Sequence, residues 1–293
     1  MDETVLGLDI GGTHFRMGVC DLAGNLIAHD SMPTASLPDA ATGLRTLAAK
    51  LDPHENAKIA VAGVPGVVDY QKSEPIFVPN LPQGFLKELS GRNIAEVLGR
   101  KSLVINDADL AAIGEAHFGA GRLSASMAYV TVSTGVGAAV VVDKKLFHTR
   151  FSAGELGHSF IDASTAAISG DGSVEYCASG TALARMAAER GVALSNQELV
   201  SRAQSGDKVA FSLVDELARN AGVALANVVH LFSVETLVLG GGVILSGEFV
   251  FDLVKSHFME LKPPYFEVKV VLAELGDNAG LVGSGAALFA LGA

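Results

Sequence analysis

Three short glycine turns, each placed directly after a stretch that reads as a buried strand, constrain this chain more than any other feature. They are DIGGT (9–13), STGVG (133–137) and LGGGV (239–243). Glycine lets backbone N–H groups approach a phosphate closely, and a neighbouring Thr or Ser adds a hydroxyl donor. One such turn alone is more often an ordinary hairpin turn. Because all three turns are rich in glycine and follow a buried strand, we test the hypothesis of phosphate binding against the rest of the sequence.

The two best-known nucleotide motifs are missing from the sequence. It contains no G-x-x-x-x-G-K-[ST], so this is not a P-loop NTPase. No G-x-G-x-x-G opens a helix after a strand, which disfavours a dinucleotide-binding fold. Residues 5–10, 14–21 and 26–32 instead read as three consecutive strands joined by small-residue turns.

Hydrophobic periodicity predicts two similar halves, each opening with a hairpin of strands and continuing into α/β units. The further elements expected are, in order, a helix over 39–51, a strand over 58–66, a strand that turns into a helix over 102–119, a hairpin over 127–146, a long helix over 207–232, a strand over 236–241, a helix over 248–260, a strand over 268–273 and a closing helix over 279–291. The expected domains are 1–115 and 116–278, with a C-terminal helix at 279–293 that returns to the first domain.

Composition narrows the class of protein. Hydrophobic residues make up 49% of the 293 residues, enough for a large core. The net charge of −11 opposes nucleic acid and anionic membranes. The stretch 127–142 is too polar to span a bilayer, and no signal peptide is apparent at the start. We therefore expect a cytoplasmic protein with neither nucleic acid nor membrane as a partner.

Nine segments, in order along nearly the whole chain, resemble the ROK family of bacterial sugar kinases and repressors. The first, in LGLDIGGTHFRMGV, resembles the first phosphate motif of the sugar kinase, Hsp70 and actin superfamily. The nine segments are DIGGT, GVPGVVD (63–69), VPNLP (78–82), INDADLAAIGE (105–115), STGVG, AGELGH (153–158), VEYCASGTAL (174–183), LVLGGGV (237–243) and AGLVGSGAAL (279–288).

This resemblance implies an α/β, two-domain actin-like ATPase fold, in which each domain is a mixed sheet flanked by helices with a cleft between them. It implies an ATP-dependent kinase that transfers the γ-phosphoryl group to the 6-hydroxyl of a hexose, with glucose favoured. N-acetylmannosamine and N-acetylglucosamine, and then fructose, stay open as substrates, because loop-dependent pocket volume decides between them. A homodimer is also implied.

A second hypothesis from a different class is a non-catalytic, sugar-sensing regulator with the same fold. The family's repressors carry an extra N-terminal helix-turn-helix. The phosphate motif at Asp9 leaves no room for one, which, with the charge, disfavours the DNA-binding branch.

A sugar kinase needs one carboxylate placed to accept the proton of the attacking hydroxyl. Asp107 stands where a strand turns into a helix, and the residues alone leave open whether Asn106 or Asp107 only caps that helix. The resemblance assigns Asp107 as the catalytic base. Asp109, two residues on, is expected to be a solvated acid of the first helical turn.

The resemblance also implies the binding residues. Read alone, Asn80 would be a turn residue and His158 a structural histidine. The implied sugar-binding set is Asn80, Asn106, Asp107, Glu155, His158 and Glu175. Gly11, Gly12, Thr13, Thr134, Gly135 and Gly137 are expected at the phosphates of ATP, and Gly241 and Gly242 beside the adenosine. Asp9 is expected to orient Mg²⁺, largely through water.

Many ROK kinases carry a zinc knuckle that resembles C-x-C-G-x-x-G-C, shortly before a glutamate. In this chain, alignment on Glu175 places Gly172 and Ser173 where its last Gly-Cys would fall, and no thiol stands in the segment 168–173. Cys20 and Cys177 are the only cysteines, too few for a disulfide framework or a cysteine zinc site. We therefore predict no zinc, with Cys177 as a packing residue in the first turn of a helix.

Overall fold

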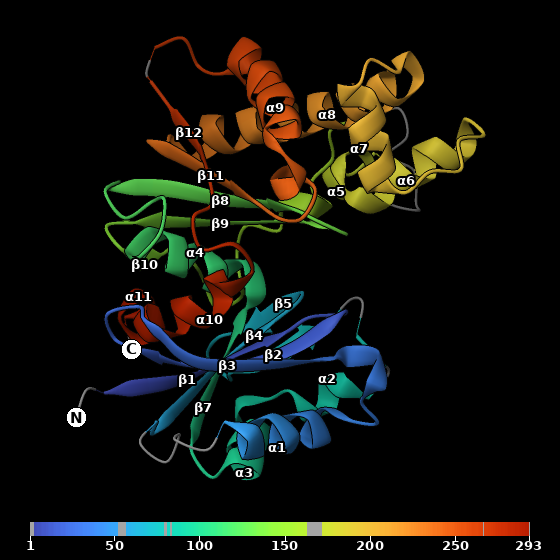
Figure 1. The fold of residues 1–293 in the computed structure, drawn as a ribbon. Helices are drawn as coiled ribbons and strands as arrows, with labels where there is room; N and C mark the ends of the chain where they lie inside the picture. Colours follow the sequence, from blue (N-terminus) through green and yellow to red (C-terminus); the bar gives the residue numbers. More distant parts are fainter. Residues whose placement is uncertain are drawn as a thin grey trace. The chain divides into compact units, whose positions relative to one another are not determined.

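The computed structural model describes residues 3–51, 57–78, 81–82, 84–162, 172–265 and 267–292. The chain forms two compact units (Figure 1). Unit 1 comprises Met1–Ala125, Ala139–Ala153 and Glu274–Ala293, and unit 2 comprises Ser126–Ala138 and Gly154–Ala273. The boundary between residues 115 and 116 stays a prediction.

Unit 1 is built on a five-stranded mixed sheet. Its strands, in spatial order, are β3 (Leu26–Pro33), β2 (His14–Asp21), β1 (Thr4–Ile10), β4 (Ile59–Val64) and β7 (Lys101–Asn106). The first three form an antiparallel meander, whereas β4 lies parallel to both β1 and β7. The three consecutive strands predicted from the sequence are confirmed.

Short helices cover both faces of this sheet. They are α1 (Ala40–Lys50), α2 (Phe85–Glu88), α3 (Gly91–Leu98) and α4 (Asp107–His117), and a small hairpin of β5 (Val67–Asp69) and β6 (Glu74–Phe77) accompanies them. Side chains start the longer helices: Asp39 accepts from the Thr42 N–H at 2.6 Å, and Ser90 from the Asn93 N–H at 3.2 Å.

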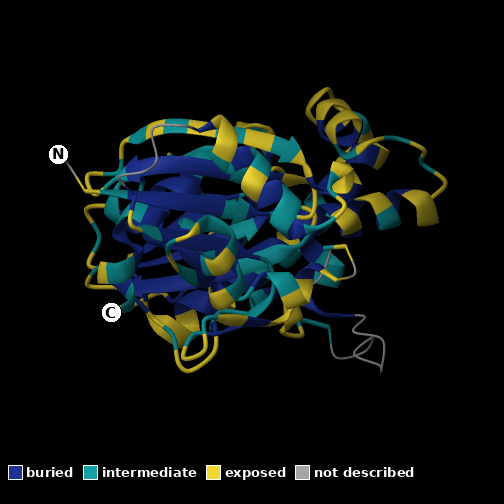
Figure 2. Ribbon diagram, turned by 90° about the horizontal axis from the view of Figure 1, so that it is seen from below, coloured by how far each residue is buried: buried dark blue, intermediate teal, exposed yellow. Residues whose placement is uncertain are grey.

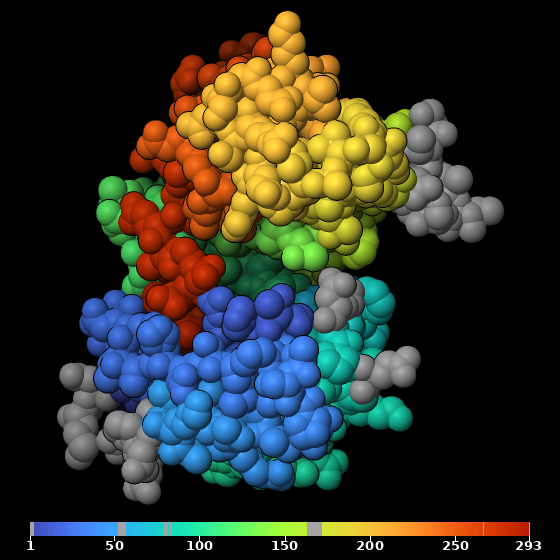
Figure 3. Space-filling view, turned by 45° about the vertical axis from the view of Figure 1, so that its right-hand side comes forward, coloured from blue at the N-terminus to red at the C-terminus, as the bar shows by residue number. Residues whose placement is uncertain are grey.

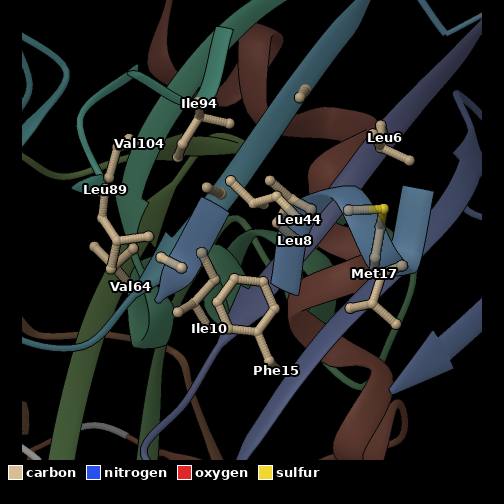
Figure 4. Packing of buried hydrophobic residues seen from close by; sticks show 14 of the residues in the cluster. Leu6, Leu8, Ile10, Phe15, Met17, Leu44, Val64, Leu89, Ile94 and Val104 are labelled. Carbon is tan, nitrogen blue, oxygen red and sulfur yellow. The ribbon is translucent and has the colours of Figure 1, made fainter. Parts of the chain in front are cut away.

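The main core of unit 1 lies between the sheet and helices α1 to α3 (Figure 4). Alternate residues of β1 point into it, because side chains of a strand alternate between the two faces. The largest labelled members are Leu6, Leu8, Ile10, Phe15, Met17, Leu44, Leu89 and Ile94. A smaller cluster contains Val5, Val61, Ile105, Leu110 and Ala287. Helices α4 and α11 (Ala287–Leu291) supply the last two, so the inner strands β1 and β4 are buried on both faces, as the nearly continuous apolar run 5–10 predicts.

The second sheet repeats the strand order of the first. Its strands, in spatial order, are β10 (Lys145–Leu146), β9 (Val136–Val142), β8 (Ser126–Val132), β11 (Thr236–Gly240) and β12 (Lys269–Leu272). Strand β11 is parallel to β8 and β12. When the five strands of each sheet are numbered in sequence order, both sheets have the spatial order 3-2-1-4-5. This shared order supports the predicted similarity of the two halves.

Unit 2 carries the two longest described helices, α8 and α9, together with three shorter ones. They are α5 (Val174–Ala178), α6 (Gly180–Glu189), α7 (Asn196–Gln204), α8 (Lys208–Phe232) and α9 (Glu248–Leu261), with a 3₁₀ turn, η3, at Leu156–His158. Figure 3 shows the surface of α6, α7 and the start of α8 in yellow to light orange. The predicted apolar face of α8 is buried from Ala210 to Val228, but Leu231 in its last turn is exposed.

The predicted closing helix is wrong as a continuous element. The chain forms α10 (Ala279–Gly283), a 3₁₀ turn η6 (Ser284–Ala286) and α11 (Ala287–Leu291). A Cβ on Gly283 would overlap the carbonyl oxygen of Leu110, and one on Gly285 would lie 2.6 Å from that of Asp21. These glycines let the segment pack very closely within unit 1, and this packing favours the break over one continuous helix.

The inner strands β4 and β11 are largely buried (Figure 2). Within the described residues, no helix has both the length and the apolar character needed to cross a membrane.

Candidate active site

Two carboxylates of unit 1 lie at one edge of the first sheet. In the parallel register, Asp9 of β1 pairs with Gly63 of β4, and Gly63 pairs with Ile105 of β7. Asp107 follows two residues after Ile105 and begins α4. A Cβ on Gly63 would lie 3.1 Å from Leu110 Cδ2 and 3.5 Å from the Asp107 Cα. Glycine at this middle strand therefore lets α4 start close beside the sheet.

The Asp9 carboxyl has a strongly perturbed pKa. Burial and, second, the negative charge of Asp107 raise it to about 7, and the positive charge of Arg16 opposes the rise. The Arg16 guanidinium donates to the Asp277 backbone oxygen at 2.6 Å. Among the described residues, no hydrogen-bond donor reaches the Asp9 carboxylate. An oxygen ligand left without a donor suits a divalent cation such as Mg²⁺.

Asp107 is half-buried, and burial is the largest cause that raises its pKa. Its Oδ1 accepts the Ala108 N–H at 2.8 Å. The helix cap is Asn106, whose Oδ1 accepts the Asp109 N–H at 3.0 Å. The Asn106 Nδ2 donates to the Gly66 oxygen at 2.8 Å, which leaves one amide hydrogen for another partner. The structure thus answers the question that the residues left open: Asn106 caps α4, and Asp107 is not needed for that role.

The expectation for Asp109 is wrong. Its exposed fraction is 0%, so it is no solvated acid. The Tyr70 hydroxyl donates to its carboxylate. The sequence suggested exposure because acids of a first helical turn usually face water, but here the carboxylate is buried and contacts Tyr70, directly after β5.

The first glycine turn joins β1 to β2. The Gly11 N–H donates to the His14 oxygen at 2.9 Å, and the Gly11 oxygen accepts the Thr34 hydroxyl at 2.6 Å. The Gly11 amide therefore closes the turn itself. Gly12 and Thr13 are exposed.

In unit 2, the turn between β8 and β9 is fastened to the start of α6. The Gly180 N–H donates to the Ser133 oxygen at 2.7 Å, and the Thr181 hydroxyl donates to the Thr134 oxygen at 2.8 Å. The Ser179 side chain caps α6 by accepting the Ala182 N–H at 3.0 Å. The segment with Thr134, Gly135 and Gly137 is consequently held from one side by a helix N-terminus.

Three predicted sugar-binding residues gather around the start of β9. The Glu175 Oε2 accepts the Val136 N–H at 2.9 Å, and a Cβ on Gly135 would overlap this carboxylate oxygen. Gly157 packs against the Glu175 side chain and lies between Glu155 and His158, whose Oε2 and Nε2 are 4.0 Å apart. One oxygen of Glu175 is thus engaged by the backbone.

Several predictions fall outside the described residues. Asn80 is one, and most of the segment before Glu175, residues 163–171, is another. Within the described part of the chain, no group of three or more His, Cys, Asp or Glu could hold a metal ion. The absence of zinc stays a prediction. Cys177 is half-buried in α5, and burial raises the pKa of its thiol, in line with the expected packing role.

A pocket of about 500 Å³ in unit 2 has the volume of a small-molecule site. It is lined by Ser133, Thr134, Gly180, Thr181, Leu183, Ala184, Asn196, Gln197, Val200, Gly242, Val243 and Ser246. Gly242 has open space where a Cβ would be, whereas Gly241 has a φ of +88° and a Cβ there would overlap the Val132 oxygen. Two predicted nucleotide residues, Thr134 and Gly242, thus meet at one pocket.

Sequence reasoning missed the contribution of α7 to this pocket. The Asn196 Nδ2 donates to the Gly180 oxygen at 2.8 Å. Its Oδ1 is buried with no hydrogen-bond partner among the described residues. The only signal at this position is the capping box of Ser195 and Glu198, which predicts the helix and nothing about what its first turn faces.

The family model described as ROK family matches residues 5–291. The chain belongs to the ROK family. It is 31% identical over 311 residues to a glucokinase of Streptomyces coelicolor, covering 95% of each chain. It is 31% identical over 296 residues to an N-acetylmannosamine kinase of Salmonella typhi, covering 99% of each.

Among solved structures, it resembles a ROK family glucokinase of Streptomyces griseus in complex with glucose and AMPPNP. The TM-score is 0.84 with 29% identity, covering 97% of this chain and 98% of the other. The predicted fold class, α/β with the two-domain actin-like fold, is confirmed.

Proposed function

We propose that this ROK protein is an ATP-dependent hexose kinase that transfers the γ-phosphoryl group to the 6-hydroxyl of glucose. The observation that carries the proposal is Asp107, a half-buried carboxylate with a raised pKa at the rigid junction of β7 and α4. A raised pKa brings the carboxylate closer to the operating pH, which makes it a better proton acceptor. The Ala108 N–H donates to Oδ1, and Oδ2 is the oxygen that we assign to the sugar hydroxyl.

The other predicted residues complete the chemistry. The pocket in unit 2 takes the adenosine, next to Gly241 and Gly242. The turns at 12–13 and 134–137 offer backbone amides and hydroxyls to the phosphates, and Gly11 supports the first of them. The sugar hydroxyls are bound by Asn80, Asn106, Glu155, His158 and Glu175, which accept or donate at fixed angles.

Mg²⁺ fits the proposal at Asp9, largely through water, because this carboxylate is near Asp107 and has no donor among the described residues. When bound, the ion neutralises charge on the transferred phosphate. Asp9 itself fixes the position of the ion and its water shell.

N-acetylmannosamine is the second candidate substrate, favoured by the full-length similarity to the N-acetylmannosamine kinase. N-acetylglucosamine and fructose follow. We further propose that the protein works in the cytoplasm as a homodimer. A sugar-sensing regulator without catalysis would bind the same sugars and turn over none of them.

A coupled ATP assay over a panel of hexoses and N-acetylhexosamines tests this function. Asp107→Asn should lower kcat by about 10²-fold or more, the usual size of a general-base contribution, while calorimetry still detects sugar binding. Asp252→Asn, at an exposed position of α9, is the matched control and should turn over like the wild type. Sugar binding without turnover of any panel member would contradict the kinase proposal.

A further inference from the structure

Asp109 is a fully buried carboxylate only two residues from the proposed catalytic base. Removing a carboxylate from water costs several kcal/mol unless partners compensate. Its carboxylate accepts the hydroxyl hydrogen of Tyr70, which lies directly after β5. A helix needs no buried acid at this position, because the cap of α4 is supplied by Asn106.

The Tyr70 hydroxyl contacts both sides of the helix start. It donates to Asp109 and accepts the backbone N–H of Asn106 at 3.2 Å. Asn106 in turn accepts the Asp109 N–H through its side chain at 3.0 Å. These bonds close a ring of three residues, and Asp107 lies within the segment that the ring encloses. Since the hydrogen bonds to the Asp107 carboxylate come from its own N–H and that of Ala108, the ring sets the position of the Asp107 backbone.

Further contacts within unit 1 fix the position of Tyr70. Its backbone N–H donates to the Arg150 oxygen at 2.8 Å, and its ring packs edge-on against His148 with centroids 5.2 Å apart. The preceding residue, Asp69, is 2% exposed and pairs with the Arg150 guanidinium at 2.7 Å. With two side-chain torsions and these supports, the phenol places its oxygen with little freedom.

We infer that Tyr70 and Asp109 are positioning residues that hold Asp107 in line with the sugar hydroxyl. The inference rests on the proposed kinase function. Proton transfer depends steeply on geometry, and a displacement of about 1 Å in a reacting group can cost about 10²-fold in rate. Tyr70 and Asp109 act on kcat through Asp107, and neither is assigned a contact with sugar or nucleotide.

Tyr70→Phe is the sharpest test, because it deletes only the bridging oxygen. We expect kcat to fall about tenfold or more, while KM for sugar and for ATP stays within about twofold. Calorimetric stoichiometry counts the binding-competent protein, so kcat is expressed per competent site and partial unfolding cannot mimic the effect. Tyr265→Phe, at an exposed tyrosine, deletes the same atom as a control and should leave kcat unchanged.

Asp109 provides the conservative pair. Asp109→Asn retains an oxygen that can accept the Tyr70 hydroxyl, so kcat should stay within about threefold of the wild type. Asp109→Ala removes the acceptor and should lose as much as Tyr70→Phe. The double variant Tyr70→Phe/Asp109→Ala should be no slower than either single variant, because the two residues act as one unit.

An unchanged kcat per competent site in Tyr70→Phe would overturn the inference, as would a rise in sugar KM equal to the loss of kcat/KM. Additive losses in the double variant would also contradict it. Failure of the proposed function has a different signature, because the wild type would then turn over no panel sugar, or Asp107→Asn would retain turnover in the same assay.

Discussion

Replacing Asp9 by Asn should make the protein more stable at neutral and alkaline pH while it harms the proposed activity. The Asp9 carboxyl is raised to about 7 in the folded protein from 3.8, chiefly by burial and by the charge of Asp107. Above pH 7 the folded protein must hold an ionised group in a place that disfavours the charge. An amide of nearly the same shape does not have this penalty.

The sign of the effect follows from proton linkage. Between pH 3.8 and about 7 the folded state binds more protons at Asp9 than the unfolded chain does, so this group's contribution to stability falls as pH rises. At 1.36 kcal/mol per pH unit, the full difference is roughly 4 kcal/mol. The advantage of Asp9→Asn should therefore grow from about pH 4 and reach its full size above about pH 7.

The assay is urea unfolding of both proteins from pH 4 to 9, in buffers free of divalent cations, compared as the difference in unfolding free energy. Subtracting the two curves removes the titrating groups that do not interact with Asp9, so the difference reports Asp9 together with its interaction with Asp107. Asp30→Asn is the control, because the Lys50 side chain holds the pKa of Asp30 below its usual value, so the contribution of this group changes only below about pH 5. The difference between that variant and the wild type should therefore stay constant from about pH 5 to 9.

A difference between Asp9→Asn and the wild type that does not change with pH would refute this reasoning. It would mean that the carboxylate of Asp9 is solvated or paired in the folded protein. Asp9→Asn should also lose most kinase turnover at saturating Mg²⁺, since it removes the proposed ion-binding oxygen.

Two further changes follow from backbone geometry and buried charge. Gly241→Ala should lower the unfolding free energy by about 1–3 kcal/mol, because its φ is +88° and its Cβ would overlap a carbonyl oxygen. Gly242→Ala should leave the unfolding free energy unchanged, so equal stability of Gly241→Ala and Gly242→Ala would contradict the backbone argument. Gly242→Leu should raise KM for ATP severalfold, because its side chain would fill the pocket. The fully buried Glu115 carboxylate accepts three backbone N–H groups, those of Ala120, Leu275 and Glu274. Glu115→Ala should therefore lower the unfolding free energy in urea by about 3–5 kcal/mol, and Glu115→Gln should lower it less. A cost below about 1 kcal/mol for Glu115→Ala would count against it.

The sequence predicted the order and type of most elements. Apolar periodicity marks α8, whose period of three and four reflects one buried helix face, and marks β1 and β11 as strands buried on both faces. Turn chemistry placed the glycine loops after those strands, and the strand-to-helix step at Asn106 and Asp107 was readable because a cap residue precedes an apolar run.

Local pattern misled where packing overrides propensity. Small apolar residues over 279–291 predict one helix, but Gly283 and Gly285 approach other backbones so closely that the helix breaks into three pieces. The sequence predicts a solvated acid at Asp109 because no residue near it in the chain indicates a buried partner. The partner is the phenol of Tyr70, directly after β5.

What the sequence determined by itself is local: which segments form strands and helices, where glycine permits a close turn, and which carboxylate begins α4. Only the tertiary structure decided which distant side chains complete each site. In the folded protein, Tyr70 donates a hydrogen bond to Asp109, and Glu175 accepts one from the N–H of Val136. Asn196 of α7 lines the same pocket as Thr134. The physical reason is that periodicity and capping act between residues a few positions apart, whereas burial, pKa shifts and hydrogen-bond rings arise between groups brought together by packing.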